Sequence, residues 1–385
     1  MPGRIVLLGA TGYTGRLVAD AMVARGLRPV LAGRDEGRLD DLSRSLGAGL
    51  DTARSDVADP PSVRALVERG DVLVSTVGPF VRHGGPAAAA AADAGAHYLD
   101  STGEPPFIRR VFGRYGRAAE LSGAGMITAF GYDFVPGNLA GAIALKRAGD
   151  RATRVDVGYF LTGDAGLASM SGGTRASLVA VTAAPAFAFR GGRVITERSA
   201  RRVRTFRVGS RRLAGVSVGG SEHFALPRLA PGLEEVNDFL GWFGPASRAM
   251  QVFSAATALG MKLPGVAGMW ESAAPRLASG STGGPDAASR SRSGSHVVAI
   301  ALDAEGRELS EVHVTGVDPY SFTGSILAWG AERAAADGVR ASGALGPVDA
   351  FGLDALVVGC REAGIAESGE ASAGGRATPR AAATI

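Results

Sequence analysis

Residues 5–15 read Ile-Val-Leu-Leu-Gly-Ala-Thr-Gly-Tyr-Thr-Gly, and a helical pattern follows over residues 16–24. This order predicts a strand, a tight turn and a helix start, where backbone N–H groups and the helix dipole can bind a pyrophosphate. We expect Gly9 to permit the turn, Gly12 to let the backbone approach the phosphates, and Gly15 to bring the helix close to the strand. The spacing alone is weak evidence, because 57 glycines in 385 residues produce chance matches. Its position between a strand and a helix indicates a dinucleotide-binding motif.

The second apolar run indicates which dinucleotide binds. Residues 29–32 are followed by Gly33-Arg34-Asp35, about 20 residues past the first turn, where such folds contact the adenosine ribose. Arg34 suits a 2′-phosphate, so we expect NADP rather than NAD. We expect Asp35 to cap a helix over 36–46, and Arg38 could also face the phosphate. The competing interpretation is an NAD site in which Asp35 binds the ribose.

Strands and helices alternate through the first third of the chain. Apolar runs at 50–53, 72–77, 97–100 and 126–130 are separated by helical patterns after Pro60, at 86–94 and at 109–121. Alternation of this kind requires right-handed crossovers and predicts an α/β fold with a doubly wound parallel sheet, the Rossmann fold. The ligand of such a sheet binds at the carboxyl ends of its strands.

The residues expected to bind the cofactor lie in the turns after these strands. The turn after the third strand should lie beside the adenine, although a strand-end cap explains its aspartate equally well. The turn after the fourth strand should lie beside the nicotinamide ribose. The expected set is Gly9, Thr11, Gly12, Tyr13, Thr14, Gly15, Gly33, Arg34, Asp56, Val57, Thr76, Val77, Gly78, Pro79 and Phe80.

The candidates for catalysis are His83, Tyr98, Asp100, Glu104 and Asp133, all near the expected position of the nicotinamide ring. A nicotinamide supplies hydride, so the protein must supply a proton or a hydrogen bond to the developing anion. Histidine has a pKa suited to proton donation, but a solvent-facing helix start explains His83 equally well. Tyr98 fits core packing, and the three carboxylates could cap helices instead of binding substrate. No His, Cys, Asp and Glu set has metal-ligand spacing, so no metal is expected.

Several motifs together carry a family resemblance. They are Gly9–Gly15, Ala32-Gly33-Arg34, Thr76–Phe80, His97-Tyr98-x-Asp100-x-x-Gly103-Glu104, Gly131-Tyr132-Asp133, Ser171–Thr174 with Ser177, and Gly316-x-Asp318-Pro319-Tyr320. With these motifs the chain resembles the saccharopine dehydrogenase-like NAD(P)-binding reductases, most of all the actinobacterial branch that includes trans-acting enoyl reductases. The resemblance spans most of residues 1–363.

This resemblance implies an NADP-dependent oxidoreductase acting on a C=C (enoyl) or C=N bond. The implied substrate is a hydrophobic acyl, polyketide, lipid or secondary-metabolite intermediate. The alternatives are a saccharopine-type amino-acid dehydrogenase and a catalytically inactive NADP-binding sensor or scaffold. The chain departs from its relatives at His83, where a tyrosine is frequent, and in the loop 131–139, which lacks the more usual serine. Both departures concern the substrate rather than the fold.

Composition predicts a globular cytoplasmic protein. Hydrophobic residues make up 46% and charged residues 20%, and the formal net charge of +4 does not indicate a nucleic-acid partner. The single cysteine, Cys360, excludes an internal disulfide and fits a reducing compartment. No signal peptide and no uninterrupted apolar run long enough to span a membrane is expected.

After about residue 150 the pattern changes to short strands separated by turns. We expect strands at 155–161, 193–197, 201–208, 213–218, 223–226, 296–302 and 309–316, and helices at 174–181, 319–335 and 347–361. Adjacent strands without helices between them predict a second, α+β domain with a mixed or antiparallel sheet. The expected organisation is an NADP-binding domain at 1–135 completed by a C-terminal helix at 345–363, a substrate or dimerisation domain at 136–340, and a disordered tail at 365–385. The Ser/Gly/Arg-rich residues 279–295 are expected to form a loop.

Two features of the second domain bear on partners. Residues 239–270 are rich in aromatic and methionine side chains, which favours helices packed on the sheet, or else a lid for an acyl chain or a peripheral membrane contact. Residues 190–212 hold nine arginines and one acid, Glu197, which favours solvated strand faces or a surface for an acidic carrier protein. The expected partners are therefore a hydrophobic or carrier-bound acyl substrate and a carrier protein, with a homodimer through the second sheet as a further hypothesis.

Arg34→Ala should weaken NADPH binding and barely change NADH binding. A charge-assisted phosphate contact contributes about 1.5–3 kcal/mol, which corresponds to a loss of roughly ten- to a hundredfold in NADPH affinity. Fluorescence titration with both cofactors measures this difference. An equal loss for both would show that Arg34 has a structural role instead.

Overall fold

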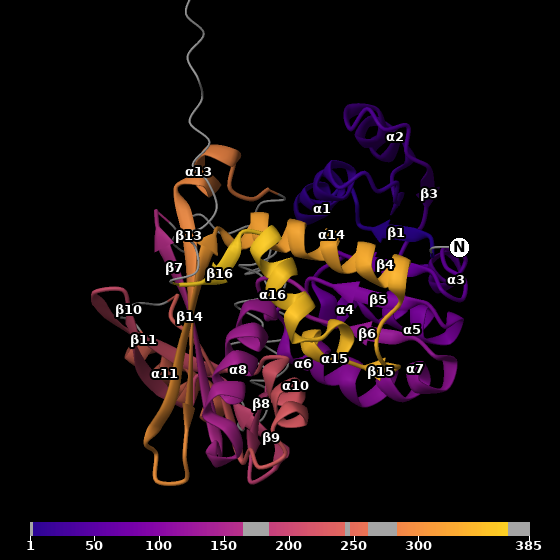
Figure 1. Ribbon diagram of the computed structural model, residues 1–385. Coiled ribbons are helices and arrows are strands. Elements are labelled where there is room, and N and C mark those ends of the chain that lie inside the picture. The colour runs from indigo at the N-terminus through magenta and orange to yellow at the C-terminus, as the bar shows by residue number, and fades with distance from the viewer. Residues whose placement is uncertain (1–2, 165–184, 243–246, 261–282, 369–385) are drawn as a thin grey trace, which may run out of the picture.

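The computed structural model describes residues 3–164, 185–242, 247–260 and 283–368. Two sheets lie side by side, and helices from both ends of the chain cover them (Figure 1). Sheet A holds the N-terminal strands, and sheet B holds the strands of the second half.

Sheet A is a doubly wound parallel sheet, as the sequence predicts. Its strands run in the order β15-β6-β5-β4-β1-β2-β3. They are β1 (Ile5–Leu8), β2 (Val30–Gly33), β3 (Thr52–Arg54), β4 (Val72–Ser75), β5 (His97–Asp100), β6 (Gly125–Ile127) and β15 (Gly343–Ala344). All pairs are parallel. Alternate side chains of β1 pack in two different hydrophobic cores, Leu7 on one face of the sheet and Leu8 on the other. Because both faces are buried, this strand is apolar throughout.

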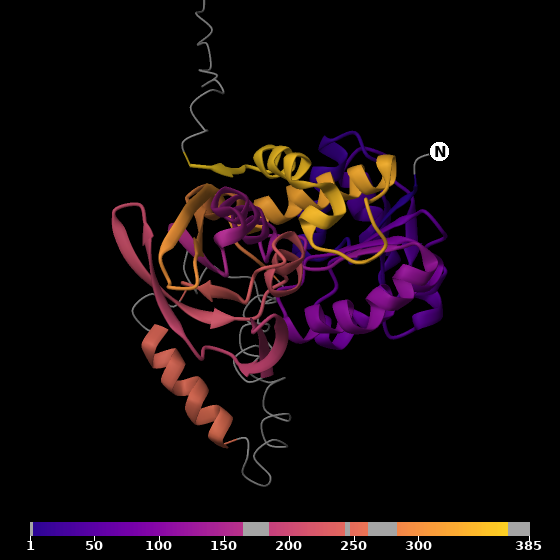
Figure 2. The ribbon, with the colours of Figure 1, turned by 60° about the horizontal axis from the view of Figure 1, so that its bottom comes forward.

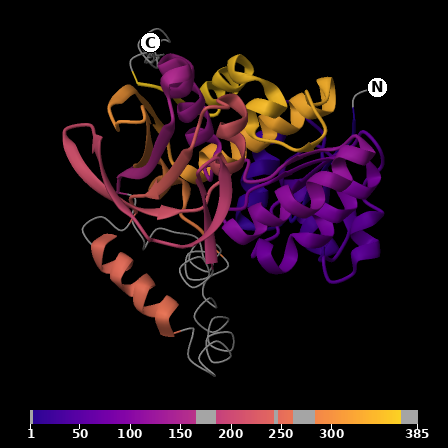
Figure 3. The same cartoon turned by 90° about the horizontal axis from the view of Figure 1, so that it is seen from below.

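Helices cover both faces of sheet A. One face packs against α1 (Tyr13–Ala24), α2 (Glu36–Ser45) and α14 (Pro319–Asp337), and α16 (Leu353–Glu362) packs on α14. The other face packs against α3 (Pro60–Arg64), α4 (Phe80–His83), α5 (Gly85–Ala94), α6 (Pro105–Arg110) and α7 (Gly116–Ser122). Figure 3 shows the purple helices that follow β4 and the orange and yellow C-terminal helices on opposite sides of the sheet.

Sheet B is mixed. Its main path is β10-β11-β12-β7-β13-β14-β16, with the hairpin β8–β9 attached to β12. The strands are β7 (Arg154–Gly163), β8 (Pro185–Arg190), β9 (Arg193–Arg198), β10 (Val203–Val208), β11 (Arg211–Val218), β12 (Glu235–Leu240), β13 (Ser293–Leu302), β14 (Glu308–Val317) and β16 (Ile365–Glu367). Only β12 and β7 pair in parallel among these described strands. The predicted α+β character of the second half is confirmed.

The helix α8 (Val135–Ala148) joins the two sheets. It begins at the carboxyl edge of sheet A and packs on β7, β13 and β14 of sheet B. Leu139 and Leu145 of α8 share one apolar core with Val18 of α1 and Val297 of β13. In contrast, α11 (Ser247–Gly260) lies on the outer side of sheet B, away from sheet A (Figure 2). The two halves therefore share a core rather than meeting at a thin interface.

Several local predictions differ from the structure. Residues 223–226 were expected as a strand but lie in the helix α10 (Glu222–Leu229), because Glu222, His223, Ala225 and Leu226 form one buried helical face. The helix expected at 347–361 is divided into α15 (Pro347–Phe351) and α16 by Gly352, whose φ is 82°. The loop expected at 279–295 contains α13 (Ala287–Ser291) and the start of β13.

Three further expectations concern the C-terminal tail, the helix at 174–181 and the domain boundaries. Residues 365–367 of the expected tail form β16 on β14, and residues 369–385 lie outside the described part of the chain. The helix expected at 174–181 also lies outside it. The boundaries at residues 135 and 340 remain predictions.

Candidate functional site

The glycine turn leaves the N-terminus of α1 open. Gly9 has a φ of 87° and donates its N–H to the Ala32 carbonyl at 2.9 Å. Gly12 is the N-cap residue of α1, and neither a capping side chain nor an acidic residue occupies its first turn. The first N–H groups of α1 therefore lie at the carboxyl edge of sheet A, and no side chain in the described part of the chain caps them. This geometry suits the pyrophosphate of a dinucleotide.

Gly15 explains how α1 approaches β1 so closely. A Cβ at Gly15 would collide with the Gly9 carbonyl oxygen and would lie 2.9 Å from the Ala10 Cα. At Gly12 the Gly9 oxygen, at 3.3 Å, is the only described atom that a Cβ would meet within 4 Å. The two glycines therefore have different roles: Gly15 is required by the packing, whereas Gly12 has space in front of it.

Basic side chains surround this turn. Arg34 is exposed at the end of β2. The guanidinium groups of Arg16 and Arg38 donate to the Thr11 carbonyl at 3.3 and 3.4 Å. Asp35 caps α2, because its Oδ1 accepts the Arg38 N–H at 3.0 Å. The edge beside β2 is thus positively charged, which favours a 2′-phosphate.

The turn after β3 holds its aspartate in a local hydrogen bond. Asp56 Oδ1 accepts the Ala58 N–H at 2.9 Å, and the Asp56 N–H donates to Ser62 Oγ at 3.0 Å. Asp56 and Val57 are half-buried. Their expected contact with the adenine remains a prediction.

The turn after β4 lies against the glycine turn and is held by a buried carboxylate. Thr76 Oγ1 donates to the Gly9 carbonyl at 3.2 Å. The peptide between Gly78 and Pro79 is cis. Glu104, 2% exposed, accepts the N–H groups of Phe80 and Val81 at 2.8 and 2.9 Å. Glu104 therefore orders the start of α4, and its role as a catalytic candidate remains untested.

The carboxylate of Asp100 is likewise hydrogen-bonded within the protein. It accepts hydrogen bonds from the N–H groups of Thr102 and Ala129, both at 2.9 Å, and from Thr128 Oγ1 at 2.8 Å. Burial raises the pKa of Asp100 to about 6, although these three hydrogen bonds act in the opposite direction. Asp100 therefore joins the loops after β5 and β6.

Asp133 differs from these two carboxylates. It is half-buried. Its carboxylate contacts the loop after β5, since a Cβ at Gly103 would be 2.6 Å from Asp133 Oδ2. Burial raises the pKa of Asp133 to about 7. A partly accessible carboxyl group that changes charge near neutral pH can give or take a proton.

The remaining two candidates occupy contrasting positions. Tyr98 is fully buried within β5, and burial raises its pKa well above the ordinary value. His83 is exposed at the end of α4. Tyr98 therefore lies in the hydrophobic core of sheet A, whereas His83 faces solvent. A catalytic role for either residue remains a prediction.

Contacts of Tyr13 come from the second half of the chain. Its hydroxyl donates to the Pro285 carbonyl at 2.6 Å and accepts from Arg290 Nη1 at 3.0 Å. Its ring packs edge-on against Tyr320, with centroids 5.3 Å apart. Sequence reasoning missed Pro285 and Arg290, while Tyr320 belongs to a motif that the sequence did single out. A segment before β13 thus lies over the start of α1.

The arginines of 190–212 are largely paired with acids of sheet B. Arg202 and Arg201 pair with Glu197, and Arg207 pairs with Glu311 at 3.0 Å. Arg204 pairs with the buried Asp156. These pairs neutralise much of the positive charge, so a surface for an acidic carrier protein remains a hypothesis.

The aromatic and methionine-rich stretch is described only in part. Phe239 is buried beside Phe160 and Phe206, which is core packing. Trp242 is half-buried, and Gln251 Nε2 of α11 donates to the Arg201 carbonyl, between β9 and β10, at 2.7 Å. Met261, Met269 and Trp270 lie outside the described residues. A lid or membrane contact remains a hypothesis.

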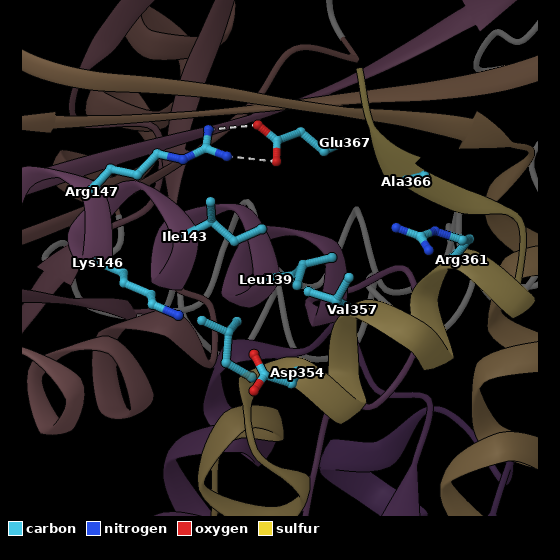
Figure 4. Close-up of a pocket in the computed structure, with 10 residues that line it drawn as sticks. Leu139, Ile143, Lys146, Arg147, Asp354, Val357, Arg361, Ala366 and Glu367 are labelled. Atoms are coloured by element: carbon cyan, nitrogen blue, oxygen red, sulfur yellow. Dashed lines mark hydrogen bonds and ion pairs between the residues drawn. The ribbon is translucent and has the colours of Figure 1, made fainter. Parts of the chain in front are cut away.

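A cavity of about 420 Å³ lies where α8, α16 and β16 meet (Figure 4). Its wall is lined by Leu139, Ile143, Leu353, Val357 and Ala366, and its rim by Lys146, Arg147, Asp354, Arg361 and Glu367. Arg147 and Glu367 close one side with two hydrogen bonds of 2.6 and 2.8 Å. None of the predicted site residues lines this cavity.

Two negative findings concern the described residues alone. In that part of the chain no cluster of His, Cys, Asp and Glu could hold a metal ion. Among the described helices none is both long and apolar enough to cross a membrane.

Comparison with known proteins identifies the first domain. Residues 5–121 match the saccharopine dehydrogenase NADP binding domain. This part of the chain is therefore an NADP-binding domain, and the prediction of NADP is confirmed.

The curated relatives match over a shorter share of their length. A putative trans-acting enoyl reductase of Mycobacterium tuberculosis is 40% identical over 141 residues, which cover 35% of this chain and 34% of the relative. A trans-acting enoyl reductase of Mycobacterium leprae is 39% identical over 140 residues, with the same coverage. The chain thus matches about a third of the length of these relatives.

A solved structure shows the fold across nearly the whole chain. Saccharopine dehydrogenase (L-Glu forming) from Saccharomyces cerevisiae superposes with a TM-score of 0.58 over 95% of this chain and 99% of that chain. The sequence identity is 13%, so this likeness concerns the fold alone.

The two glycines should respond differently to the same substitution. Gly12→Val should abolish NADPH binding and leave the melting temperature of the cofactor-free protein near wild type, because the added atoms point into open space. Gly15→Val should lower the melting temperature by several degrees, because its Cβ meets backbone atoms. Thermal unfolding and fluorescence titration measure both effects. Normal NADPH binding in Gly12→Val would show that the turn does not bind the pyrophosphate.

Proposed function

We propose that this chain is an NADPH-dependent reductase that saturates the C=C bond of a hydrophobic enoyl thioester. The NADP-binding domain and the two mycobacterial relatives support this class of reaction. The observation that carries the proposal is Asp133, a half-buried carboxyl group at the edge of sheet A with its pKa raised to about 7.

The groups at the carboxyl edge of sheet A would have separate roles in binding and catalysis. The N-terminus of α1 would bind the pyrophosphate, and Arg34 with Arg38 would bind the 2′-phosphate. When bound, the nicotinamide supplies a hydride to the β-carbon of the enoyl group. Protonated Asp133 would then donate its proton to the α-carbon, so that one hydride and one proton saturate the bond.

The charge of this edge argues against the amino-acid dehydrogenase alternative. Asp100 ends β5, Glu104 immediately precedes α6, and Asp133 lies in the loop between β6 and α8. A substrate with several carboxylates would be repelled by those of these three groups that are ionised. An uncharged acyl thioester would not be repelled.

Turnover of enoyl thioesters of increasing chain length tests the proposed function. Burying each methylene contributes about 0.8 kcal/mol, so kcat/KM should rise about fourfold per carbon until the pocket is full. The oxidation of NADPH, followed by its absorbance, measures the rate. Equal rates from four to twelve carbons would contradict a hydrophobic acyl site. Turnover of charged amino acids alone would favour the saccharopine-type alternative, and no turnover at all would favour the sensor.

Asp133 predicts the pH dependence of the reaction. A proton donor is active while it is protonated, so kcat should fall as the pH rises through about 7. Asp133→Asn should lower kcat by roughly a hundredfold and remove this pH dependence, while the Kd for NADPH stays near wild type. His83→Gln is the matched comparison, because His83 is the exposed competing candidate. Loss of the pH dependence in His83→Gln, and not in Asp133→Asn, would assign proton donation to His83.

A further inference from the structure

A segment from the second half of the chain lies over the first turn of α1. Residues 283–291 come just before β13, and Figure 1 shows the orange chain before α13 running toward α1. The backbone of this segment packs on the ring of Tyr13, since a Cβ at Gly284 would collide with that ring. The Tyr13 hydroxyl donates to the Pro285 carbonyl at 2.6 Å. The segment therefore meets the turn that we expect to bind the pyrophosphate.

Arg290 of α13 is the charged group of this contact. Its Nη1 donates to the Tyr13 hydroxyl at 3.0 Å and to the Pro285 carbonyl at 2.9 Å. Since the Tyr13 hydroxyl donates to the same carbonyl, the three atoms form a closed triangle of hydrogen bonds. This triangle fixes a positive charge beside the first residue of α1.

The charge of Arg290 has no acidic partner among the described residues. Its described hydrogen bonds go to uncharged groups, and its Nε is buried without an acceptor in that part of the chain. Asp20, two turns along α1, is close enough for Arg290 to lower its pKa, but the two form no ion pair in the described structure. The Asp318 carboxylate accepts the N–H groups of Tyr320 and Ser321 at 3.0 and 3.1 Å. A partly buried cation without a counter-charge is costly, so an anion bound beside it is stabilised.

The N-terminus of α1 adds a second source of positive potential at the same place. Tyr13 is the first helical residue after the N-cap Gly12, and the first turn of α1 holds no acidic residue. The helix dipole leaves a partial positive charge at this end. Arg290 is hydrogen-bonded to the side chain of this same first residue. Two positive groups side by side repel each other, and a pyrophosphate bound at the turn would give both of them a counter-charge.

We propose that Arg290 is a further binding residue for the pyrophosphate of the cofactor, supplied by the second half of the chain to the NADP-binding domain. Held by Tyr13 and Pro285, its charge stabilises the pyrophosphate at the N-terminus of α1. The bound pyrophosphate in turn holds residues 283–291 on that helix. The proposal concerns a group that NADPH and NADH share, so it is independent of which substrate is reduced. Arg290 thus differs from Arg34, which we expect at the 2′-phosphate of NADPH alone.

Four ligands separate the roles of the two arginines. NADPH and NADH contain the pyrophosphate, ADP-ribose contains it without the nicotinamide or the 2′-phosphate, and 2′-AMP contains the 2′-phosphate without the pyrophosphate. Arg290→Gln should raise the Kd about tenfold or more for NADPH, NADH and ADP-ribose, and should leave the Kd for 2′-AMP near wild type. Arg34→Ala should weaken NADPH and 2′-AMP instead. Titration calorimetry measures all four Kd values. In Arg290→Gln, a loss for all four ligands, or for none, would overturn the proposal.

A matched control and the salt dependence separate charge from anchoring. Arg292→Gln makes the same change two residues away, where Arg292 pairs with the exposed Asp164 at 3.1 Å, and it should leave all four Kd values near wild type. The loss in Arg290→Gln should shrink between about 20 mM and about 0.5 M NaCl, because salt screens charges. Arg290→Lys keeps the charge and should keep most of the NADPH affinity. Equal losses in Arg290→Lys and Arg290→Gln that do not depend on salt would show that Arg290 only anchors the segment, and would overturn the proposal.

Hydrogen–deuterium exchange of the wild-type protein tests the same contact without a substitution. Saturating ADP-ribose should slow the exchange of the backbone amides in residues 283–292, because the pyrophosphate adds a contact that holds this segment on α1. Saturating 2′-AMP should leave their exchange unchanged. This measurement decides the question if Arg290→Gln fails to fold. Equal exchange of residues 283–292 with and without ADP-ribose would contradict the proposal.

Discussion

The close contact between α1 and β1 is the constraint on which the candidate site depends. Gly15 lets the helix rest on the backbone of Gly9 and Ala10, with no room for a side chain. This contact aims the uncapped N-terminus of α1 at the edge of sheet A. A dinucleotide bound at this edge would meet backbone N–H groups that no described side chain caps, together with the positive end of the helix. The guanidinium groups of Arg16 and Arg38 at the Thr11 carbonyl extend this positive region, in the direction where we propose the 2′-phosphate.

The carboxylates at the carboxyl edge of sheet A differ in their hydrogen-bond partners. The carboxylate oxygens of Asp100 and Glu104 accept hydrogen bonds from backbone N–H groups of neighbouring loops, which orders the turns at this edge of sheet A. Asp133 has no comparable set of donors among the described residues, and burial raises its pKa to about 7. All three are carboxylates near the carboxyl edge of sheet A, so residue type alone does not separate a loop anchor from a candidate proton donor, whereas their hydrogen-bond partners do.

The helix α8 makes the two sheets into one unit. It starts beside Asp133 and packs on the three strands β7, β13 and β14, so the loop of sheet A and the buried groups of sheet B are held together. The carbonyl of Phe134, at the start of this helix, accepts from both Tyr159 and Asn138. A substitution in sheet B can therefore shift the position of the Asp133 loop, although the substituted residue contacts neither cofactor nor substrate.

The sequence by itself determined the Rossmann half, the NADP preference and the mixed character of the second sheet. These follow from short-range patterns, because glycine spacing, alternating apolar runs and the residue after a strand act on near neighbours. The strand expected at 223–226 was wrong, since the burial that makes this segment helical comes from contacts distant in sequence. Tyr159 and Glu222 are 63 residues apart, and Tyr13 and Pro285 are 272 apart. Only the tertiary structure brought these groups together, because no local pattern records which buried side chains will meet across two sheets.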